Sequence, residues 1–227
     1  QDELWLVAGG IFGGSLYFFT ENTALGITQA SNVSFIICTA PLLTTILSLL
    51  FYKSEKASKG LIYGSLLALM GVGLIVFNGS FVLKISPIGD LLTLLAALSW
   101  AFYSLIIKKM AGRYPTIFIT RKIFFYGVLT ILPAFLLHPL HPDTVVLLQP
   151  AVLFNLLFLA VLASLICYVL WNVVLKQLGT VRASNYIYLN PLVTMIASFL
   201  ILDEKITLVA LGGAACIVCG VYWAEKK

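Results

Sequence analysis

Residues 34–55 read SFIICTAPLLTTILSLLFYKSE, an apolar run of helical length that one proline, Pro41, interrupts and a glutamate closes. The same design returns at residues 186–204, which read YIYLNPLVTMIASFLILDE. Matching residues recur 150 positions apart as Pro41/Pro191, Thr44/Thr194 and Ser48/Ser198, and 149 apart as Gly64/Gly213 and Gly71/Gly220. Weak internal similarity of this kind indicates that the chain contains two copies of one unit.

The composition identifies the surroundings of the chain as lipid. Hydrophobic residues make up 61% of the sequence and charged residues 10%, against about 25% charged in soluble domains. The mean hydropathy is +1.04. A soluble fold of this length could not bury so much apolar surface, so we expect a lipid bilayer as the partner of most of the surface. The net charge of +5 is then interpreted as a membrane-orientation signal, and no nucleic-acid partner is expected.

Eight runs approach the roughly 20 apolar residues that a membrane-spanning helix needs. They lie at 4–24, 31–52, 60–78, 88–107, 117–137, 152–175, 183–202 and 207–223. The connections between them are short and carry most of the charges. The predicted fold class is all-α, a polytopic membrane helix bundle.

The distribution of Lys and Arg predicts the orientation. Twelve of the 14 fall on one side: Lys53, Lys56, Lys59, Lys108, Lys109, Arg113, Arg121, Lys122, Lys176, Arg182, Lys226 and Lys227. The other side holds only Lys84 and Lys205. Because Lys and Arg are enriched in cytoplasmic loops, the first side, with the C-terminus, is predicted to be cytoplasmic.

The repeat and the orientation together predict an inverted architecture. The runs at 31–52 and 183–202 cross in opposite directions, and copies related in this way are typical of alternating-access transporters. Inversion requires an odd number of spans in each copy. Because three spans match and two lie between them, the unit has five helices, and eight of an expected ten are present. Residues 1–79 would form the last three helices of the first copy, and 80–227 the complete second copy.

Several short motifs resemble the EamA-domain family of the drug/metabolite transporter superfamily. The resembling residues are Ala24-Leu25, Ala30-Ser31-Asn32, Gly89-Asp90, Trp100-Ala101, Tyr168, Trp171-Asn172, Ala183-Ser184-Asn185, Asn190-Pro191-Leu192 and Gly212-Gly213-Ala214. The resemblance covers essentially the whole chain and rests on the order of the motifs. It implies a ten-helix exporter or importer of small metabolites, such as amino acids or amphipathic compounds, in a bacterial inner membrane. The chain departs from this pattern by lacking the first two helices, the first of which is expected to line the central cavity.

The two prolines are predicted hinges. Each removes an N–H and frees the carbonyl four residues earlier, at Ile37 and at Ile187. A freed carbonyl in lipid needs a partner or a cavity. Kinks at Pro41 and Pro191 would then face the substrate path, and the alternative is a pair of packed kinks without that role.

Apart from Asp90, the third residue of the run at 88–107, Glu21 is the only acid inside a predicted span. Burial of a carboxylate in lipid is costly, so we expect it to face the bundle interior, where it could bind a substrate amine or couple protons. The alternative is a hydrated position near the outer interface, about 25 Å along the helix from Leu4.

Amides and aromatic rings at matching positions predict the rest of a substrate cavity. Asn22 and Asn172 are 150 residues apart, and Tyr186 and Asn190 share a helical face at four-residue spacing. The full set of expected substrate-binding residues is Glu21, Asn22, Trp100, Tyr103, Tyr168, Trp171, Asn172, Tyr186 and Asn190. The alternative is that these groups make interhelical hydrogen bonds and interfacial anchors.

Other motifs receive structural interpretations. Gly9, Gly10, Gly13 and Gly14 form overlapping G-x-x-x-G patterns, which indicate close helix packing within the bundle or in a homodimer. We expect no metal site, although His138, His141 and Asp143 could hold one, and Cys216-x-x-Cys219 is interpreted as packing. No phosphate-binding glycine loop precedes a Lys-Ser/Thr pair, so no ATP-driven mechanism and no cofactor are expected.

The predicted function is therefore a secondary transporter of small metabolites by alternating access, most consistent with an exporter. Two alternatives stay open: a helical membrane partner that transports nothing, and an intramembrane enzyme. The second would require titratable groups clustered at one depth.

Overall fold

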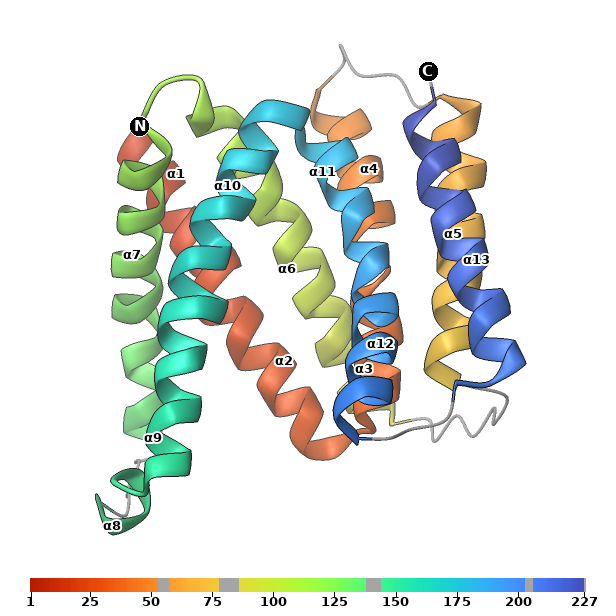
Figure 1. The fold of residues 1–227 in the computed structure, drawn as a ribbon. Coiled ribbons are helices and arrows are strands. Elements are labelled where there is room, and N and C mark those ends of the chain that lie inside the picture. The colour runs from red at the N-terminus through yellow and green to blue at the C-terminus, as the bar shows by residue number, and fades with distance from the viewer. Residues whose placement is uncertain (53–57, 78–85, 138–143, 203–205, 227) are drawn as a thin grey trace.

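A computed structural model describes residues 1–52, 58–77, 86–137, 144–202 and 206–226. Regular structure in these ranges is helical throughout (Figure 1). The first half comprises α1 (Asp2–Gly10), η1 (Ile11–Ser15), α2 (Leu16–Ile27), α3 (Ala30–Ile37), α4 (Ala40–Phe51) and α5 (Lys59–Phe77). Then come α6 (Pro87–Ala111), α7 (Thr116–Leu137), α8 (Thr144–Leu147), α9 (Pro150–Leu157), η2 (Phe158–Ile166) and α10 (Cys167–Leu178). The last elements are α11 (Thr180–Asn185), η3 (Tyr186–Leu189), α12 (Asn190–Leu202) and α13 (Leu208–Glu225).

Most of these elements join into helices that can cross a membrane. Within the described ranges, seven helices are long and apolar enough, and they coincide with seven of the eight predicted spans. The eighth, α1–η1–α2, also crosses the bundle in Figure 1, although its glycines and Glu21 dilute its hydropathy. The prediction of a polytopic, all-α membrane bundle is confirmed.

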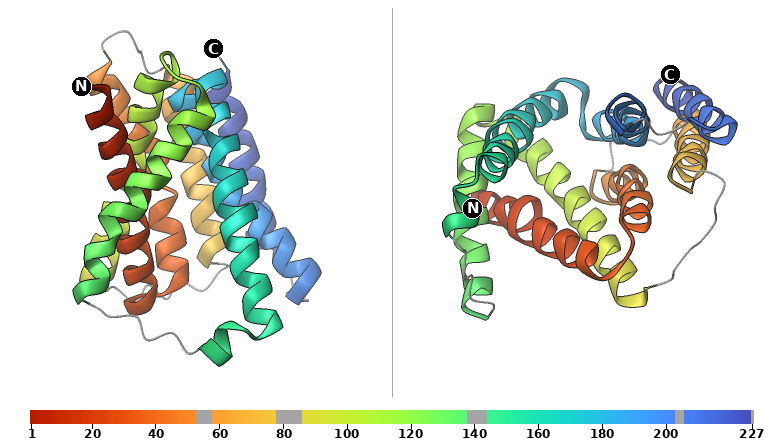
Figure 2. Two further views of the ribbon diagram at one scale, coloured as in Figure 1. Left: turned by 90° about the vertical axis from the view of Figure 1, so that its left-hand side faces the viewer. Right: turned by 60° about the horizontal axis from the view of Figure 1, so that its bottom comes forward.

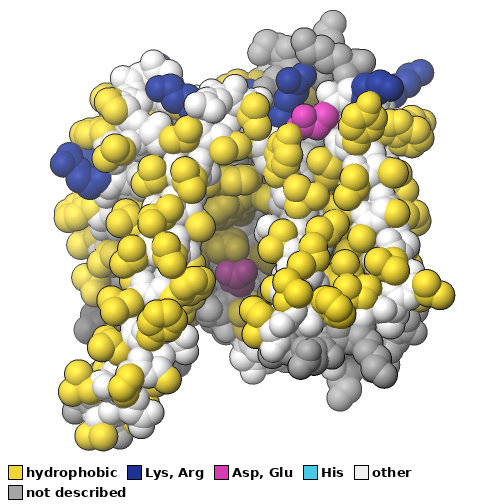
Figure 3. All heavy atoms as spheres, viewed as in Figure 1, with side chains coloured by type: hydrophobic (Ala, Val, Ile, Leu, Met, Phe, Trp, Pro, Cys, Tyr) yellow, Lys and Arg dark blue, Asp and Glu magenta, His cyan; other side chains and the backbone are white. Residues whose placement is uncertain are grey.

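The termini and the positive charges share one end of the bundle. Figure 1 places both termini at that end, and Figure 3 shows the Lys and Arg side chains gathered there. This agrees with the charge asymmetry of the sequence. Lys53, Lys56, Lys84, Lys205 and Lys227 lie outside the described residues. The predicted division between 79 and 80 also lies outside them and stays a prediction.

Antiparallel helices α5 and α13 form the most extensive helix pair. A Cβ on Gly64 would collide with the carbonyl oxygen of Gly220, and one on Gly71 would collide with that of Gly213. Glycine at these positions therefore lets the two backbones touch. In the repeat, Gly64 corresponds to Gly213 and Gly71 corresponds to Gly220. Exchange of the two copies therefore turns the Gly64–Gly220 contact into the Gly71–Gly213 contact, as a two-fold axis in the membrane plane requires.

The glycines of the first helix pack inside the chain. A Cβ on Gly10 would meet Tyr126 and Gly127 of α7, one on Gly13 would meet the Tyr103 ring, and one on Gly14 would meet Gly127. Of the two interpretations of the G-x-x-x-G patterns, the structure supports packing within the bundle.

Both prolines begin a helix. Pro41 lies in the first turn of α4, after a break at Cys38 and Thr39 where the Thr39 hydroxyl donates to the Ile36 carbonyl at 2.7 Å. Pro191 is the second residue of α12 and follows the 3₁₀ turn η3. The matching interruptions are therefore sharper than the kinks expected from sequence, because the α-helix ends before each proline.

Helix α6 is the central element of one buried cluster. It lies between α1–α2 and α3–α4 (Figure 2), and its Tyr103, Ile107 and Met110 are fully buried with Tyr168 and Leu175 of α10. A second cluster joins α5 and α13 to Cys38 and Tyr188. The first cluster contains Tyr103 and Tyr168, with Trp100 and Trp171 packed against it.

Candidate functional site

A hollow opens between α10 on one side and α11–α12 on the other (Figure 3). Apolar side chains line its walls, and an acidic side chain lies deep inside it. Helices α2 and α6 lie behind the hollow (Figure 1).

Trp100 of α6 is the centre of an aromatic cluster. Its ring centroid lies 5.0 Å from that of Tyr17, 5.2 Å from Tyr103, 5.7 Å from Tyr168 and 5.7 Å from Trp171. Tilted and edge-on contacts at these distances favour a fixed arrangement of the rings. The structure thus brings four predicted residues together: Trp100, Tyr103, Tyr168 and Trp171.

A buried hydrogen-bond chain holds the far side of this cluster. The Tyr103 hydroxyl donates to Asn172 Oδ1 at 2.7 Å, and Asn172 Nδ2 donates to the Thr120 hydroxyl at 2.9 Å. The Tyr168 hydroxyl donates to the Gly13 carbonyl at 2.7 Å. Asn172 therefore ties α6, α7 and α10 together, which is the interhelical role named as its alternative.

Glu21 is linked to the cluster through Tyr17. It is partly buried, and its Oε1 accepts a hydrogen bond from the Tyr17 hydroxyl at 3.0 Å. Tyr17 is not among the predicted site residues, although its ring is what joins the carboxylate to Trp100.

The two indole N–H groups have no hydrogen-bond partner in the described structure. Nε1 of Trp100 and Nε1 of Trp171 are both buried, and their rings are 5.7 Å apart. A buried donor without a partner is costly. Two such donors in one cluster beside a hollow are suited to a ligand that brings its own acceptor atoms.

Three of the predicted residues lie apart from the cluster. Asn22 is exposed, and its amide donates to the Phe18 carbonyl of its own helix at 2.8 Å. Tyr186 is 38% exposed and hydrogen-bonds Glu225 at the end of α13, while Asn190 is exposed on α12. For Tyr186 and Asn190 the reason lies in η3: the four-residue spacing assumed an α-helix, and a 3₁₀ turn rotates its residues differently.

A second buried polar group is not among the predicted site residues. Asn185 of α11 is fully buried, and its Oδ1 accepts from the Ser65 hydroxyl of α5 at 3.4 Å. Asn185 was read only as part of a family motif. Asn185 lies inside the predicted span 183–202, and an amide inside such a span needs an internal partner. This position is the feature of the sequence that could have predicted its burial.

Two π-helical segments occupy corresponding places in the two copies. Segment η1 (Ile11–Ser15), shifted by the 150-residue repeat, falls inside η2 (Phe158–Ile166). Two carbonyls of η1 accept side-chain hydrogen bonds, Phe12 from Ser99 at 2.8 Å and Gly13 from Tyr168. Such segments are rare and are frequent at functional sites, and no pattern in the sequence predicted them.

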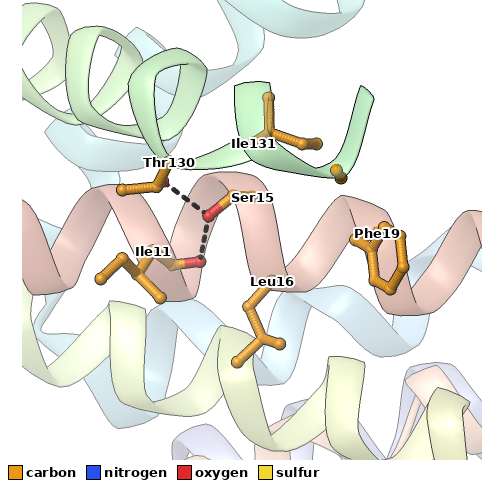
Figure 4. A pocket seen from close by; sticks show the side chains of 7 residues that line it. Ile11, Ser15, Leu16, Phe19, Thr130 and Ile131 are labelled. Carbon is orange, nitrogen blue, oxygen red and sulfur yellow. Dashed lines mark hydrogen bonds between the residues drawn. The ribbon is translucent and has the colours of Figure 1, made fainter. Parts of the chain in front are cut away.

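The opposite face of η1 borders a smaller cavity of about 340 Å³ against α7 (Figure 4). There Ser15 and Thr130 share a hydrogen bond of 2.8 Å, and the Ser15 hydroxyl also approaches the Ile11 carbonyl (Figure 4). Together these bonds connect the widened turn to α6, α7 and α10.

No group of three or more His, Cys, Asp or Glu side chains with metal-binding geometry occurs in the described ranges. The candidate ligands His138, His141 and Asp143 lie outside those ranges. Cys38 is buried, and Cys216 and Cys219 lie on the apolar helix α13.

Comparison with known proteins yields one family. The model described as the EamA-like transporter family matches residues 1–77 and 87–224. An uncharacterized transporter of Archaeoglobus fulgidus is 30% identical over 230 residues, which cover 100% of this chain and 78% of that protein. A probable amino-acid metabolite efflux pump of Salmonella typhimurium is 29% identical over 182 residues, covering 76% of this chain and 60% of the pump. A solved crystal structure superimposes with a TM-score of 0.80 at 20% identity, covering 98% of this chain and 75% of that one.

Proposed function

Because the chain belongs to the EamA-like transporter family, we propose that it moves a small zwitterionic metabolite across the membrane by alternating access, with the central hollow as its binding site. The membrane it occupies would be a bacterial inner membrane, with the C-terminus in the cytoplasm. Export is the proposed direction, since two similar proteins are named as probable amino-acid metabolite efflux pumps.

One observation supports the substrate class: groups that complement an amino acid meet in the same aromatic cluster. The Glu21 carboxylate can attract an ammonium group, and the buried N–H groups of Trp100 and Trp171 can donate to a carboxylate. The aromatic rings of the cluster can contact an apolar side chain of the substrate. These three features are those of an amino acid.

The same arrangement supports transport over the alternative of an intramembrane enzyme. The cluster contains one carboxylate, several phenols and two indoles, and these groups bind and orient a solute. Paired acid and base groups, which general acid–base catalysis uses, do not meet around Trp100 among the described residues.

The experiment is counterflow of a labelled amino-acid panel into proteoliposomes that contain the purified protein. We expect uptake of at least one amino acid and a loss of about tenfold or more in Glu21→Gln and in Trp100→Phe, because each removes a charged hydrogen bond worth about 1.5–3 kcal/mol. Trp171→Phe should behave like Trp100→Phe.

The matched control is Trp223→Phe, which removes an exposed indole on α13. It should leave uptake unchanged. Wild-type uptake in all three site variants would remove the assignment of the site. Conversion of a panel member to a covalent product, without counterflow, would favour the enzyme.

A further inference from the structure

A second large cavity lies on the side of α6 that faces away from the central hollow. Its volume is about 630 Å³, within the usual range of small-molecule sites. From α6 it is lined by Phe102, Leu105, Ile106 and Lys109, whose spacing places them on one helical face. Trp100 and Tyr103 occupy the opposite face, so this cavity is separate from the proposed transport site.

The walls of the cavity are apolar and aromatic. The Phe102 ring lies 5.2 Å from Phe12 of η1 and 6.3 Å from Phe51 of α4. Phe51 is 65% exposed, so this side of the groove opens toward the surrounding bilayer. Walls of this kind suit a hydrocarbon chain and offer little to a polar solute.

Among the described residues, the cations that border the groove lie at one end of it. Lys109 Nζ lies 3.6 Å from the Trp5 ring centroid, and Lys108 Nζ lies 4.2 Å from the Tyr52 ring centroid. Both lysines end α6 on the side of the bundle that holds the positive charges, at the depth of lipid headgroups.

The acids of α1 at this end already have other partners. Asp2 pairs with Arg113 at 2.7 Å, and Glu3 pairs with Lys122 at 2.6 Å. The hydrogen bond from Arg113 holds the pKa of the Asp2 carboxyl below its usual value, so that carboxylate stays ionised and engaged. Among the described residues, Lys109 is therefore left without a carboxylate, and its contact is the Trp5 ring.

We propose that this groove binds one anionic phospholipid of the cytoplasmic leaflet, with its phosphate on Lys109 and an acyl chain along Phe12, Phe51 and Phe102. A cation at the headgroup level and an apolar groove below it match the two parts of such a lipid. The rim of the groove is positively charged because of Lys108 and Lys109, so we expect an anionic lipid in preference to a zwitterionic one. The groove lies between α1 and α4, which belong to the first predicted copy, and α6, which belongs to the second. The bound lipid would therefore fill the space between the two copies.

The test is native mass spectrometry of the purified full chain in micelles with equal amounts of phosphatidylglycerol and phosphatidylcholine of matched acyl chains. We expect phosphatidylglycerol to be retained about fivefold over phosphatidylcholine, as one interfacial lysine predicts. Lys109→Gln should abolish this preference. Ala8→Phe, which fills the groove, should reduce retention of both lipids, and an unchanged circular dichroism spectrum confirms that it folds.

Lys176→Gln is the matched control, since it removes an exposed lysine of α10 at the same end of the bundle. It should keep the preference. Equal loss in both lysine variants would show attraction to the overall positive surface and overturn the proposal, as would equal retention of the two lipids by the wild type. A free amino acid bound to the groove would overturn it too.

Discussion

Asn22 and Asn172 show how one residue type takes two roles at equivalent places of a repeat. Asn172 is 1% exposed and bridges Tyr103 and Thr120. Asn22 is exposed and bonds only its own helix. The difference arises because α10 packs against α6 and α7 at Asn172, while Asn22 points away from its neighbours.

Asn172→Ala is expected to destabilise the protein by about 1–3 kcal/mol, because it leaves the buried Tyr103 hydroxyl without a partner. Asn22→Ala is the control and should change stability by less than about 0.5 kcal/mol. Unfolding in mixed micelles measures both. The double variant Tyr103→Phe/Asn172→Leu should recover most of the loss, since no buried donor then remains unpaired. Equal effects of the two alanine variants would contradict the structural role of Asn172.

At the scale of elements, the two copies share an interruption in each of two helices. Segments η1 and η2 widen the first matched helix of each copy, and the breaks before Pro41 and Pro191 divide the second. A π-helical turn contains one residue more than the α-helical turn it replaces, so its carbonyls are displaced and accept from outside. Ser99 and Tyr168 supply those donors to η1. We infer that these four places are where the helices bend between states.

Deletion of Gly14 is expected to convert η1 to a regular α-helix without rotating the flanking helices against each other. Folding should survive, with an unchanged elution profile in size-exclusion chromatography, while counterflow falls about tenfold or more because the Tyr168 and Ser99 contacts shift. Deletion of Val128, in the regular helix α7, is the control. It rotates half of that helix by about 100° and should prevent folding. Wild-type counterflow after the Gly14 deletion would remove the role of the π-helical turn.

At the scale of the whole molecule, the contacts between α5 and α13 show how the two copies of the repeat are related by a two-fold axis. Their glycines meet as Gly64 with Gly220 and Gly71 with Gly213, and exchange of the copies converts one contact into the other. Helices that pair in this way cross the membrane in opposite directions, and their first residues lie on opposite sides.

The orientation in the membrane can be checked by cysteine labelling of a variant in which the four native cysteines are replaced. Gly112→Cys lies between α6 and α7, where a Cβ meets open space, and Leu208→Cys lies at the exposed start of α13. An impermeant maleimide should label Leu208→Cys in intact cells and Gly112→Cys only after permeabilisation. Equal labelling of both in intact cells would contradict the orientation predicted from the lysines and arginines.

The sequence by itself determined the lipid surroundings, the all-helical fold, the positions of most membrane-spanning helices and the antiparallel course of α5 and α13. Each of these depends on sums over many residues: hydropathy over a span, charge over a loop, and spacing over a repeat. Such sums tolerate small local deviations. The repeated glycines Gly64, Gly71, Gly213 and Gly220 lie where α5 and α13 meet.

Only the tertiary structure decided which polar side chains meet. Spacing along an ideal helix grouped Tyr186 with Asn190, and the 150-residue repeat grouped Asn22 with Asn172. The structure instead joins Trp100, Tyr103, Tyr168 and Trp171 and adds Tyr17. One residue turns an α-helix by about 100°, so a π-helical or 3₁₀ turn is enough to move a side chain from the hollow to the lipid. Those local turns depend on neighbouring helices that are distant in sequence, and for that reason the chain's own pattern does not reveal them.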